Sequence, residues 1–292
     1  MSEAALKEPA PEVRRQGTLP LYVEDVPIDD HCVGNRWIAQ NEAQLARLIA
    51  IIAMGQAAYA AYILRECLPA QPAFTYLEQI QEARLHLTVQ AETATPQAGY
   101  PRAQRDGFIF EAISWIAAKQ TCTERALLTY PHVSATSQGI DGLMIELTED
   151  NAEVTKTMVF EDKCTEDPRR MFRDHVMKAF LDRHSNKRSV ELVAAASALL
   201  RQVVGDAAAA RLSAAVMNRQ ARSYRASFAL TAEDDGQERW KRLFKGYDGL
   251  EGLMAEQRIG AGLVVTGELR QWFDALAQQA IAYLDELVAA QG

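Results

Sequence analysis

The chain has 292 residues, of which 48% are hydrophobic and 24% are charged, and its formal net charge is −8. This composition is ordinary for a globular protein, and the length suffices for one large core or for a core with a helical annex. Proteins that bind nucleic acid non-specifically are usually basic, so the acidic balance excludes a chain whose whole surface is cationic. Any contact with nucleic acid must come from a local patch, a metal or a partner.

The N-terminal segment, the longest uncharged run and the cysteines together indicate a cytoplasmic protein. Residues 1 to 17 are polar and contain proline, so they predict a disordered tail without the apolar core of a signal peptide. The longest uncharged run, residues 48 to 64, is at the lower limit for a membrane span and is rich in alanine, which favours a packed helix. Four widely separated cysteines are typical of reduced thiols and not of a zinc site: Cys32, Cys67, Cys122 and Cys164.

Residues 18 to 100 predict a mainly helical N-terminal region. Within it, residues 18 to 37 indicate an extended and irregular segment. Apolar residues at three- and four-residue steps predict a helix over residues 38 to 67, and a second helix follows over residues 72 to 90. The composition of residues 91 to 102 is typical of a linker, and we expect a domain boundary there.

Residues 101 to 292 predict an α/β domain. The apolar patterns predict helices over residues 106 to 120, 168 to 183, 190 to 204, 206 to 218, 236 to 247 and 269 to 290. Strands are expected over residues 142 to 147, 154 to 163, 223 to 231 and 259 to 268. The first two strands are separated by a short turn and should pair antiparallel. This order predicts a mixed sheet that is covered by helices.

Charged residues stand at the ends of the first two of these strands. Asp141 precedes the first strand, and Glu161 and Lys163 end the second. Side chains alternate along a strand, so Glu161 and Lys163 point to one face and Asp162 to the other. If the strands pair with a shift, Asp141 comes close to Glu161. We therefore expect two carboxylates and one ammonium group to cluster at an edge of the sheet.

This cluster suits chemistry on a phosphodiester. Two carboxylates can hold Mg²⁺, with Mn²⁺ as an alternative, and the backbone carbonyl of Asp162 could be a further ligand beside Asp141 and Glu161. The cation would lower the pKa of a bound water and offset charge on a phosphoryl oxygen. Lys163 would orient the attacking water or stabilise charge in the transition state, and proximity to the metal would favour its neutral amine.

The pattern resembles the PD-(D/E)xK nuclease superfamily. The resemblance covers about residues 105 to 235 and lies in Ile140, Asp141 and Gly142, a spacer of about twenty residues, and then Phe160, Glu161, Asp162 and Lys163. Ile140 stands where the family often has proline. The resemblance implies a restriction-endonuclease-like sheet, with Asp141 and Glu161 as metal ligands and Lys163 as the cation that orients water or phosphate. Such families often add a glutamate from a preceding helix, and Glu111 fits that place as an outer ligand or base.

A basic run follows the motif and predicts contact with DNA. Residues 164 to 188 hold seven Lys and Arg against four Asp and Glu. Four of these basic residues are expected to follow a phosphate backbone towards the metal: Arg169, Arg170, Arg173 and Lys178. Arg183, Lys187 and Arg188 of the same run could follow the backbone as well, and Arg219, Arg222 and Arg225 form a second basic cluster that could also contact DNA.

The acidic balance and the helical N-terminal region suggest that another subunit delivers or gates the DNA. Bacterial defence systems often pair a nuclease of this superfamily with a helicase or another ATPase. The Hachiman nuclease subunit is similar in size and in motif layout, so the resemblance implies an effector subunit of an anti-phage defence or restriction complex.

Other interpretations stay open at this point. The hairpin could carry solvated, inert charges, and the chain could be a non-catalytic interaction subunit whose helices contact other proteins. Cys164 could act as a nucleophile with His175 as its base, and His175 or His184 could lie near the scissile phosphate. The glycines of residues 259 to 268 could approach a nucleotide, although a buried strand explains them better.

Overall fold

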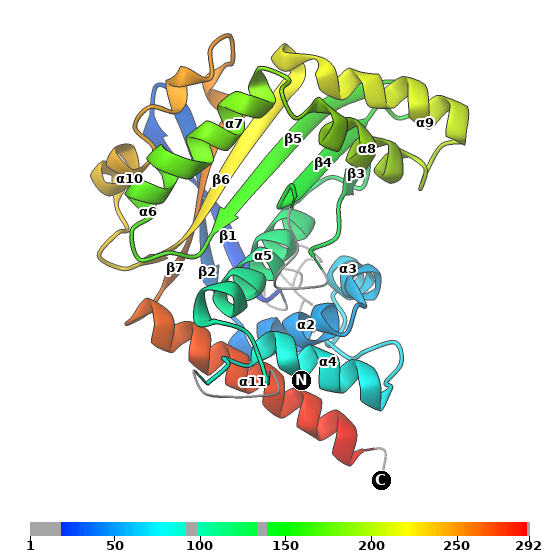
Figure 1. Cartoon of the computed structure of the whole chain (residues 1–292), viewed down its shortest axis with the longest axis vertical. Helices are drawn as coiled ribbons and strands as arrows, with labels where there is room; N and C mark the ends of the chain where they lie inside the picture. Colours follow the sequence, from blue (N-terminus) through cyan, green and yellow to red (C-terminus); the bar gives the residue numbers. More distant parts are fainter. Residues whose placement is uncertain (1–18, 92–97, 133–138, 291–292) are drawn as a thin grey trace, which may run out of the picture.

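The computed structural model describes residues 19 to 91, 98 to 132 and 139 to 290. The tail predicted over residues 1 to 17 and the middle of the predicted linker lie outside the described residues. Seven strands form one sheet in the order β1-β2-β7-β6-β5-β4-β3 (Figure 1). Their bounds are β1 (Leu21–Asp29), β2 (Cys32–Ala39), β3 (Ala126–Leu128), β4 (Gly142–Leu147), β5 (Val154–Lys163), β6 (Arg222–Thr231) and β7 (Arg258–Val265).

The sheet is mixed, as the sequence predicts. Strands β2, β7, β6 and β5 run parallel to one another, whereas β1, β4 and β3 pair antiparallel with their neighbours. The prediction of an α/β protein with a mixed sheet flanked by helices is confirmed. The three-residue strand β3 was not predicted, because so short a segment carries no periodic signal.

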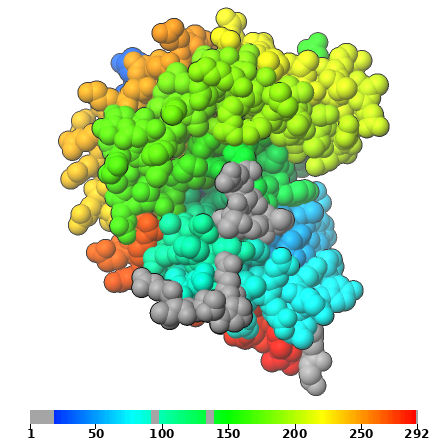
Figure 2. All heavy atoms as spheres, viewed as in Figure 1, coloured from blue at the N-terminus to red at the C-terminus, as the bar shows by residue number. Residues whose placement is uncertain are grey.

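Helices cover both faces of the sheet. One face packs against α2 (Glu42–Ala53), α3 (Ala57–Glu66), α4 (Leu77–Leu87), α5 (Arg102–Thr121) and α11 (Leu269–Ala289). The other face packs against α6 (Pro168–Met171), α7 (Met177–His184), α8 (Ser189–Leu200), α9 (Asp206–Ser213) and α10 (Gln237–Leu243). In Figure 2, α6 to α9 form the upper green and yellow part of the surface, above α4, α5 and α11.

Short helical turns interrupt some of the predicted helices. A π-helical turn, Phe172–Val176, separates α6 from α7 within the single helix predicted over residues 168 to 183. Four 3₁₀ turns complete the described structure: Ala214–Met217, Arg219–Ala221, Tyr247–Gly249 and Ala255–Gln257. A π-helical turn is a frequent mark of a functional site, and this one begins directly after Met171, which lines the cavity described below.

The predicted extended segment over residues 18 to 37 is instead a hairpin of the main sheet. Strand β2 pairs in parallel with the central strand β7 and buries Trp37. The side chain of Asp29 accepts hydrogen bonds from the backbone N–H groups of His31 (2.8 Å) and Cys32 (3.1 Å), which closes the turn. Pro27 lies within β1, which is an edge strand, where a missing N–H donor is tolerated.

The helix predicted over residues 38 to 67 is also divided. Its first residues belong to β2, and α2 and α3 are separated at Gly55, whose φ of 78° lies in the left-handed region. The side chain of Gln56 then accepts a hydrogen bond from Ala73 and donates one to the carbonyl of Phe74. The uncharged run therefore forms two short buried helices. Within the described ranges, no helix has both the length and the apolar content to cross a membrane.

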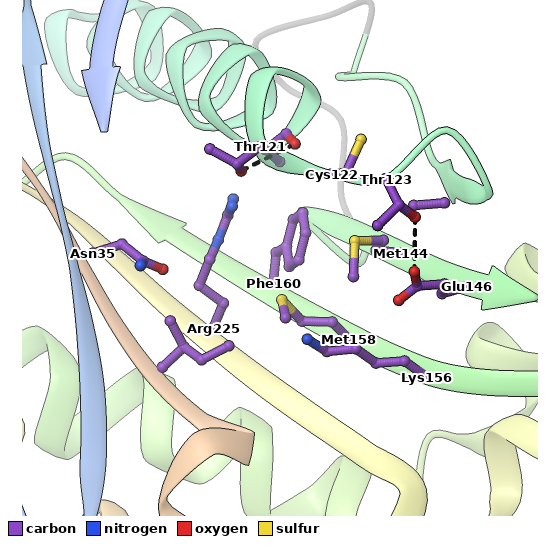
Figure 3. Close-up of a pocket in the computed structure, with 13 residues that line it drawn as sticks. Asn35, Thr121, Cys122, Thr123, Met144, Glu146, Lys156, Met158, Phe160 and Arg225 are labelled. Carbon is purple, nitrogen blue, oxygen red and sulfur yellow. Dashed lines mark hydrogen bonds between the residues drawn. The ribbon is translucent and has the colours of Figure 1, made fainter. Parts of the chain in front are cut away.

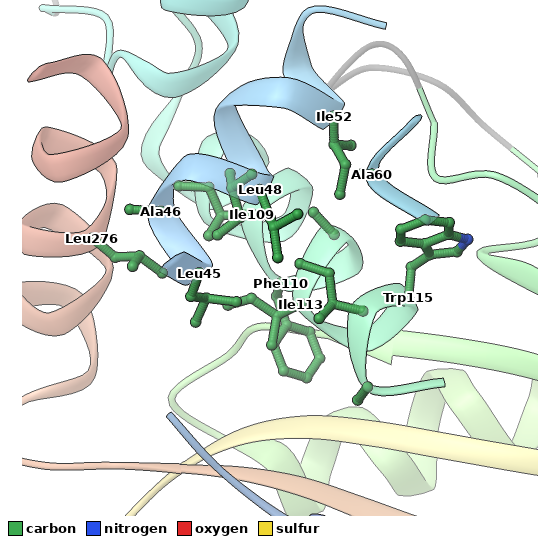
Figure 4. Packing of buried hydrophobic residues seen from close by; sticks show 14 of the residues in the cluster. Leu45, Ala46, Leu48, Ile52, Ala60, Ile109, Phe110, Ile113, Trp115 and Leu276 are labelled. Atoms are coloured by element: carbon green, nitrogen blue, oxygen red, sulfur yellow. The ribbon is translucent and has the colours of Figure 1, made fainter. Parts of the chain in front are cut away.

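The residues before the expected boundary share their core with the residues after it. Figure 4 shows Leu45 and Leu48 of α2 packed beside Ile109 and Ile113 of α5. Leu276 of α11 reaches the same cluster. The N-terminal part thus contributes two strands and three helices to one body, and it does not form a separate helical layer.

Candidate active site

The antiparallel pairing of β4 and β5 brings the two predicted acids together. Gly142 pairs with Phe160, so the next position in the register places Asp141 beside Glu161. Lys163 Nζ lies 2.6 Å from Asp141 Oδ2 and 2.9 Å from Glu161 Oε2. The expected cluster of two carboxylates and one ammonium group is therefore present at the end of β5.

The glycine of the motif has a packing reason. A Cβ atom at Gly142 would lie 2.5 Å from the Phe160 ring, which is closer than real Cβ contacts allow. The absence of a side chain lets β4 approach β5 at this point. The backbone N–H of Asp162 then donates to Asp141 Oδ2 over 2.8 Å. The Asp141 carboxylate is thus fixed by one backbone donor and one ammonium group.

Glu161 has a second cationic partner that the sequence prediction did not assign to the site. Arg183 on α7 donates from Nη1 to Glu161 Oε1, while Glu161 Oε2 faces Lys163. The Arg183 side chain is only 1% exposed. Arg183 belongs to the basic run that was expected to contact DNA phosphates, but its side chain is buried inside the protein. One signal in the sequence was available. Arg183 lies at helical spacing from Val176 and Phe180, which are buried, and a buried cation requires an anionic partner.

Asp162 points to the opposite face of β5, as alternation predicts. Its Oδ1 atom lies 3.8 Å from Nη2 of Arg225, and both side chains are buried. Burial raises the pKa of Asp162 above its usual value, and burial lowers the pKa of Arg225. Whether the backbone carbonyl of Asp162 binds a metal stays a prediction.

Glu111 on α5 joins the site through a cavity and through His132. A cavity of about 320 Å³ is lined by Glu111, Asp141, Lys163 and Met171, among others. Glu111 Oε1 accepts a hydrogen bond of 2.7 Å from the backbone N–H of His132, and Oε2 lies 3.1 Å from His132 Nδ1. These contacts with Glu111 raise the pKa of the imidazole against the opposing effect of burial. His132 was not predicted, and a lone histidine in a loop gives no periodic signal.

The charge state of Lys163 follows from its two partners. Burial alone would lower the pKa of its amine, but the carboxylates of Glu161 and Asp141 raise it above the usual value. In this arrangement the amine is an ammonium ion. The neutral amine that we expect beside a metal is thus not the state that these two pairings favour.

The site offers the oxygen donors that a divalent ion needs, but the Lys163 ammonium group occupies the position where the ion would bind. Asp141 and Glu161 offer oxygen donors, which Mg²⁺ and Mn²⁺ prefer. Their facing oxygens converge on the Lys163 ammonium group, so an ion shared by both carboxylates requires Lys163 to move aside. Across residues 19 to 91, 98 to 132 and 139 to 290, no group of three or more His, Cys, Asp or Glu residues is arranged to hold a metal.

The residues predicted to contact DNA differ in whether their charged groups already have partners within the protein. Arg169 donates to the carbonyls of Leu243 (2.9 Å) and Lys245 (2.7 Å), so its guanidinium group is engaged at the end of α10. Arg173 pairs with the adjacent Asp174, with Nε 2.6 Å from Oδ1. The side chains of Arg170, Arg173 and Lys178 are exposed to solvent.

The second predicted basic cluster does not form a surface. Arg222 is buried and donates to the carbonyl groups of Val216 and Arg183, and Arg225 is buried beneath α5. Both lie on the central strand β6, whose residues are covered on both faces. Only Arg219 of that cluster is exposed, so the three arginines do not form a surface patch for phosphate.

The structure also bears on the alternative sites. Burial raises the pKa of the Cys164 thiol to about 12, which disfavours the thiolate that a nucleophile needs. His184 Nε2 lies 3.0 Å from the carbonyl oxygen of Glu251. A Cβ atom at Gly260 or Gly262 would lie 2.5 Å from the Phe244 ring or 2.8 Å from the Trp240 ring. These glycines admit aromatic packing, which explains them without a nucleotide.

Comparison of the chain with family models, with curated proteins and with solved structures gives no match.

Proposed function

We propose that the chain is a Mg²⁺- or Mn²⁺-dependent nuclease that hydrolyses phosphodiester bonds, with DNA as the substrate. The observation that carries this proposal is the convergence of Asp141, Glu161 and Lys163 at the C-terminal end of β5, where both carboxylates lie within 2.9 Å of Lys163 Nζ. Asp141 and Lys163 line a cavity together with Glu111, and Glu161 Oε2 lies 2.9 Å from the Lys163 amine. These carboxylates and this cation are the groups that metal-assisted phosphodiester hydrolysis requires.

The element order supports a restriction-endonuclease-like fold as part of the proposal. Helix α5 is followed by three antiparallel neighbours, β3, β4 and β5, then by α6 to α9, and then by β6 in parallel beside β5. The superfamily resemblance implies this sequence of elements, with the acids on the second and third of the strands. The hairpin β1–β2, the helices α2 to α4 and the C-terminal α11 surround this arrangement.

Each side chain has a role in the proposed reaction. Asp141 and Glu161 would hold the ion, together with the backbone carbonyl of Asp162, and the ion would supply charge stabilisation and an acidified water when bound. Lys163, released from the carboxylates, would face the attacking water or the phosphate. Arg183 holds Glu161 Oε1 and therefore fixes the direction of the other oxygen. Glu111 would serve as an outer ligand or base, and its Oε2 atom lies 3.1 Å from His132 Nδ1.

The proposed setting is a cytoplasmic bacterial defence or restriction complex with a helicase or other ATPase subunit. An acidic chain needs help to bring DNA to its site. Support for a protein partner comes from exposed apolar side chains on the connection between α3 and α4, where Phe74 is 49% and Tyr76 is 61% exposed.

One observation favours a second function, that of a non-catalytic interaction subunit of a nucleic-acid-processing complex. Both oxygens of Glu161 already have cationic partners, so the cluster is also satisfied as a purely structural ion-pair network. In that case Lys163 would hold β4 to β5 and nothing else. The two functions differ in whether Lys163 is needed for cleavage.

A cleavage assay tests the proposal. Wild-type protein and the Lys163→Ala variant are incubated with duplex DNA, single-stranded DNA and RNA, each with Mg²⁺, with Mn²⁺ and with EDTA. We expect cleavage of DNA by the wild type that depends on the metal, and a rate at least about 100-fold lower for Lys163→Ala.

The matched control is Lys156→Ala, which changes another lysine of the same strand, outside the cavity of Glu111 and Lys163. It should keep the wild-type rate. Equal cleavage by wild type and Lys163→Ala would reject the assigned site. Native purification through a tag on this chain tests the partner: a co-purifying ATPase supports the proposed setting.

A further inference from the structure

A buried arginine lies beneath α5, beside two cavities at the C-terminal end of that helix. Arg225 lines one cavity of about 230 Å³ and a second of about 330 Å³. Asn35 and Thr121 line both cavities as well, so the two adjoin. In Figure 3 the Arg225 side chain extends from β6 between Asn35 and Phe160, towards Thr121 at the end of α5.

Arg225 is held in place without using its full hydrogen-bonding capacity. Its Cζ atom lies 3.7 Å from the centroid of the Phe160 ring and 5.2 Å from that of Trp37. Within the part of the chain that the structure describes, its hydrogen bonds come from Nη2 alone and go to Ser114. The Nε atom is buried and has no hydrogen-bond partner among the described residues.

The charge of Arg225 is also compensated only loosely. Its nearest carboxylate oxygen, Asp162 Oδ1, lies 3.8 Å away, and the Arg225 side chain is 6% exposed. A buried cation of this kind normally pairs closely with an anion, since desolvation is costly. The loose ion pair, beside cavities that Arg225 lines, therefore points to a missing anionic partner there.

The other residues that line the cavity indicate the chemistry of the rest of the ligand. Apolar side chains surround the space beside the guanidinium group: Ala118, Ala126, Met144, Met158, Phe160 and Ile259. Lys156 adds a second cationic group to the lining. Glu146 also lines it, but its carboxylate accepts a hydrogen bond of 2.7 Å from Thr123. The larger cavity is at the lower end of the usual range of about 300–1,000 Å³ for ligand pockets, and the smaller one lies below it.

We propose that this cavity binds a small organic carboxylate with an apolar body, whose carboxylate meets Arg225 and whose body packs on Met144, Met158 and Phe160. The site stands on the geometry of α5 and the sheet and does not rest on the proposed nuclease function. Carboxylate is favoured over free phosphate because apolar side chains form part of the wall beside Arg225, and an inorganic ion would leave them uncovered.

Calorimetric titration of the full-length chain tests this site with benzoate, hexanoate, acetate and inorganic phosphate as probes, together with the Tm shift that each causes. We expect saturable binding of benzoate and hexanoate, at least about tenfold tighter than that of acetate or phosphate. Absence of saturable binding by any of the three carboxylates would overturn the proposal. So would phosphate binding as tight as that of benzoate.

Two variants locate the binding. Arg225→Met removes the cation and should weaken benzoate binding at least about tenfold, whereas the matched Arg219→Met change on the surface should leave it unchanged. If Arg225→Met fails to fold, Thr121→Phe serves in its place: Thr121 is solvent-exposed at the end of α5 and lines both cavities, so the larger ring would obstruct them. Unaltered benzoate binding by a folded Thr121→Phe variant would place the ligand elsewhere and overturn the assignment.

Discussion

The two faces of β5 each carry a buried carboxylate, and the two carboxylates differ in how closely they are paired with cations. On one face, Glu161 has a cationic partner for each oxygen, Arg183 for Oε1 and Lys163 at 2.9 Å from Oε2. On the other face, Asp162 has a single arginine at 3.8 Å, and that arginine opens onto cavities. Adjacent residues of one strand therefore carry a closed charge network and an open one. A closed network fixes geometry, whereas an open one leaves capacity for a ligand.

The closed network should be the more costly one to break. Replacing Arg183 by Met leaves the buried Glu161 with one cation fewer, and removal of one partner of a buried ion pair typically costs about 3–5 kcal/mol. We expect a fall of that size in the free energy of unfolding, measured by urea denaturation. The control is Lys187→Met, an exposed lysine shortly after α7, which should change the free energy by less than about 1 kcal/mol. A cost for Arg183→Met as small as that of the control would show that the network is not closed.

The open network should be cheaper to break, and the cost should depend on pH. Arg225→Met removes the cation beside Asp162, and we expect a loss of about 1–3 kcal/mol, since the carboxyl group can take up a proton instead. Burial already raises the pKa of Asp162 in the folded protein. The raised pKa means that the folded state binds the proton more tightly, so stability falls as pH rises above the unfolded value of about 3.9.

Urea denaturation of Arg225→Met at pH 5 and at pH 8 checks this sign. The variant should lose more stability relative to the wild type at pH 8 than at pH 5. The double variant Arg225→Met with Asp162→Asn has no carboxyl group to titrate, so its loss should be similar at the two pH values. A single-variant loss that is the same at both pH values would contradict the account of Asp162.

The smallest expected effect concerns His132, at the rim of the closed network. Its contact with Glu111 raises the imidazole pKa above the usual value of about 6.5. Titration of the ring by NMR should show this, and Glu111→Gln should lower the pKa. The stability from this pair is fully present below the unfolded pKa and is lost as pH rises through the folded one. A matched Glu78→Gln change on the remote helix α4 should leave the titration unaltered.

The features that the sequence predicted depend on interactions between residues close together in the chain. The features that it missed depend on contacts between distant residues. Asp141, Glu161 and Lys163 meet because a short hairpin and a two-residue alternation fix their positions, and both features are local. Arg183 reaches Glu161 only because α7 packs across the sheet, and no local pattern encodes that distance. The strand of Trp37 was missed because its partner β7 begins more than two hundred residues later in the chain. Arg222 and Arg225 looked like a surface cluster because sequence spacing does not reveal that β6 is central.

The central claim is that Asp141 and Glu161 share one cation position, which Lys163 occupies until a divalent ion enters. Titration of Mn²⁺ into wild type and Lys163→Met, followed by electron paramagnetic resonance of the free ion, tests it most directly. We predict binding by both proteins, tighter in Lys163→Met because the competing ammonium group is gone, and its loss when Asp141→Asn is added. Failure of Lys163→Met to bind Mn²⁺, or binding that survives Asp141→Asn, would contradict the claim.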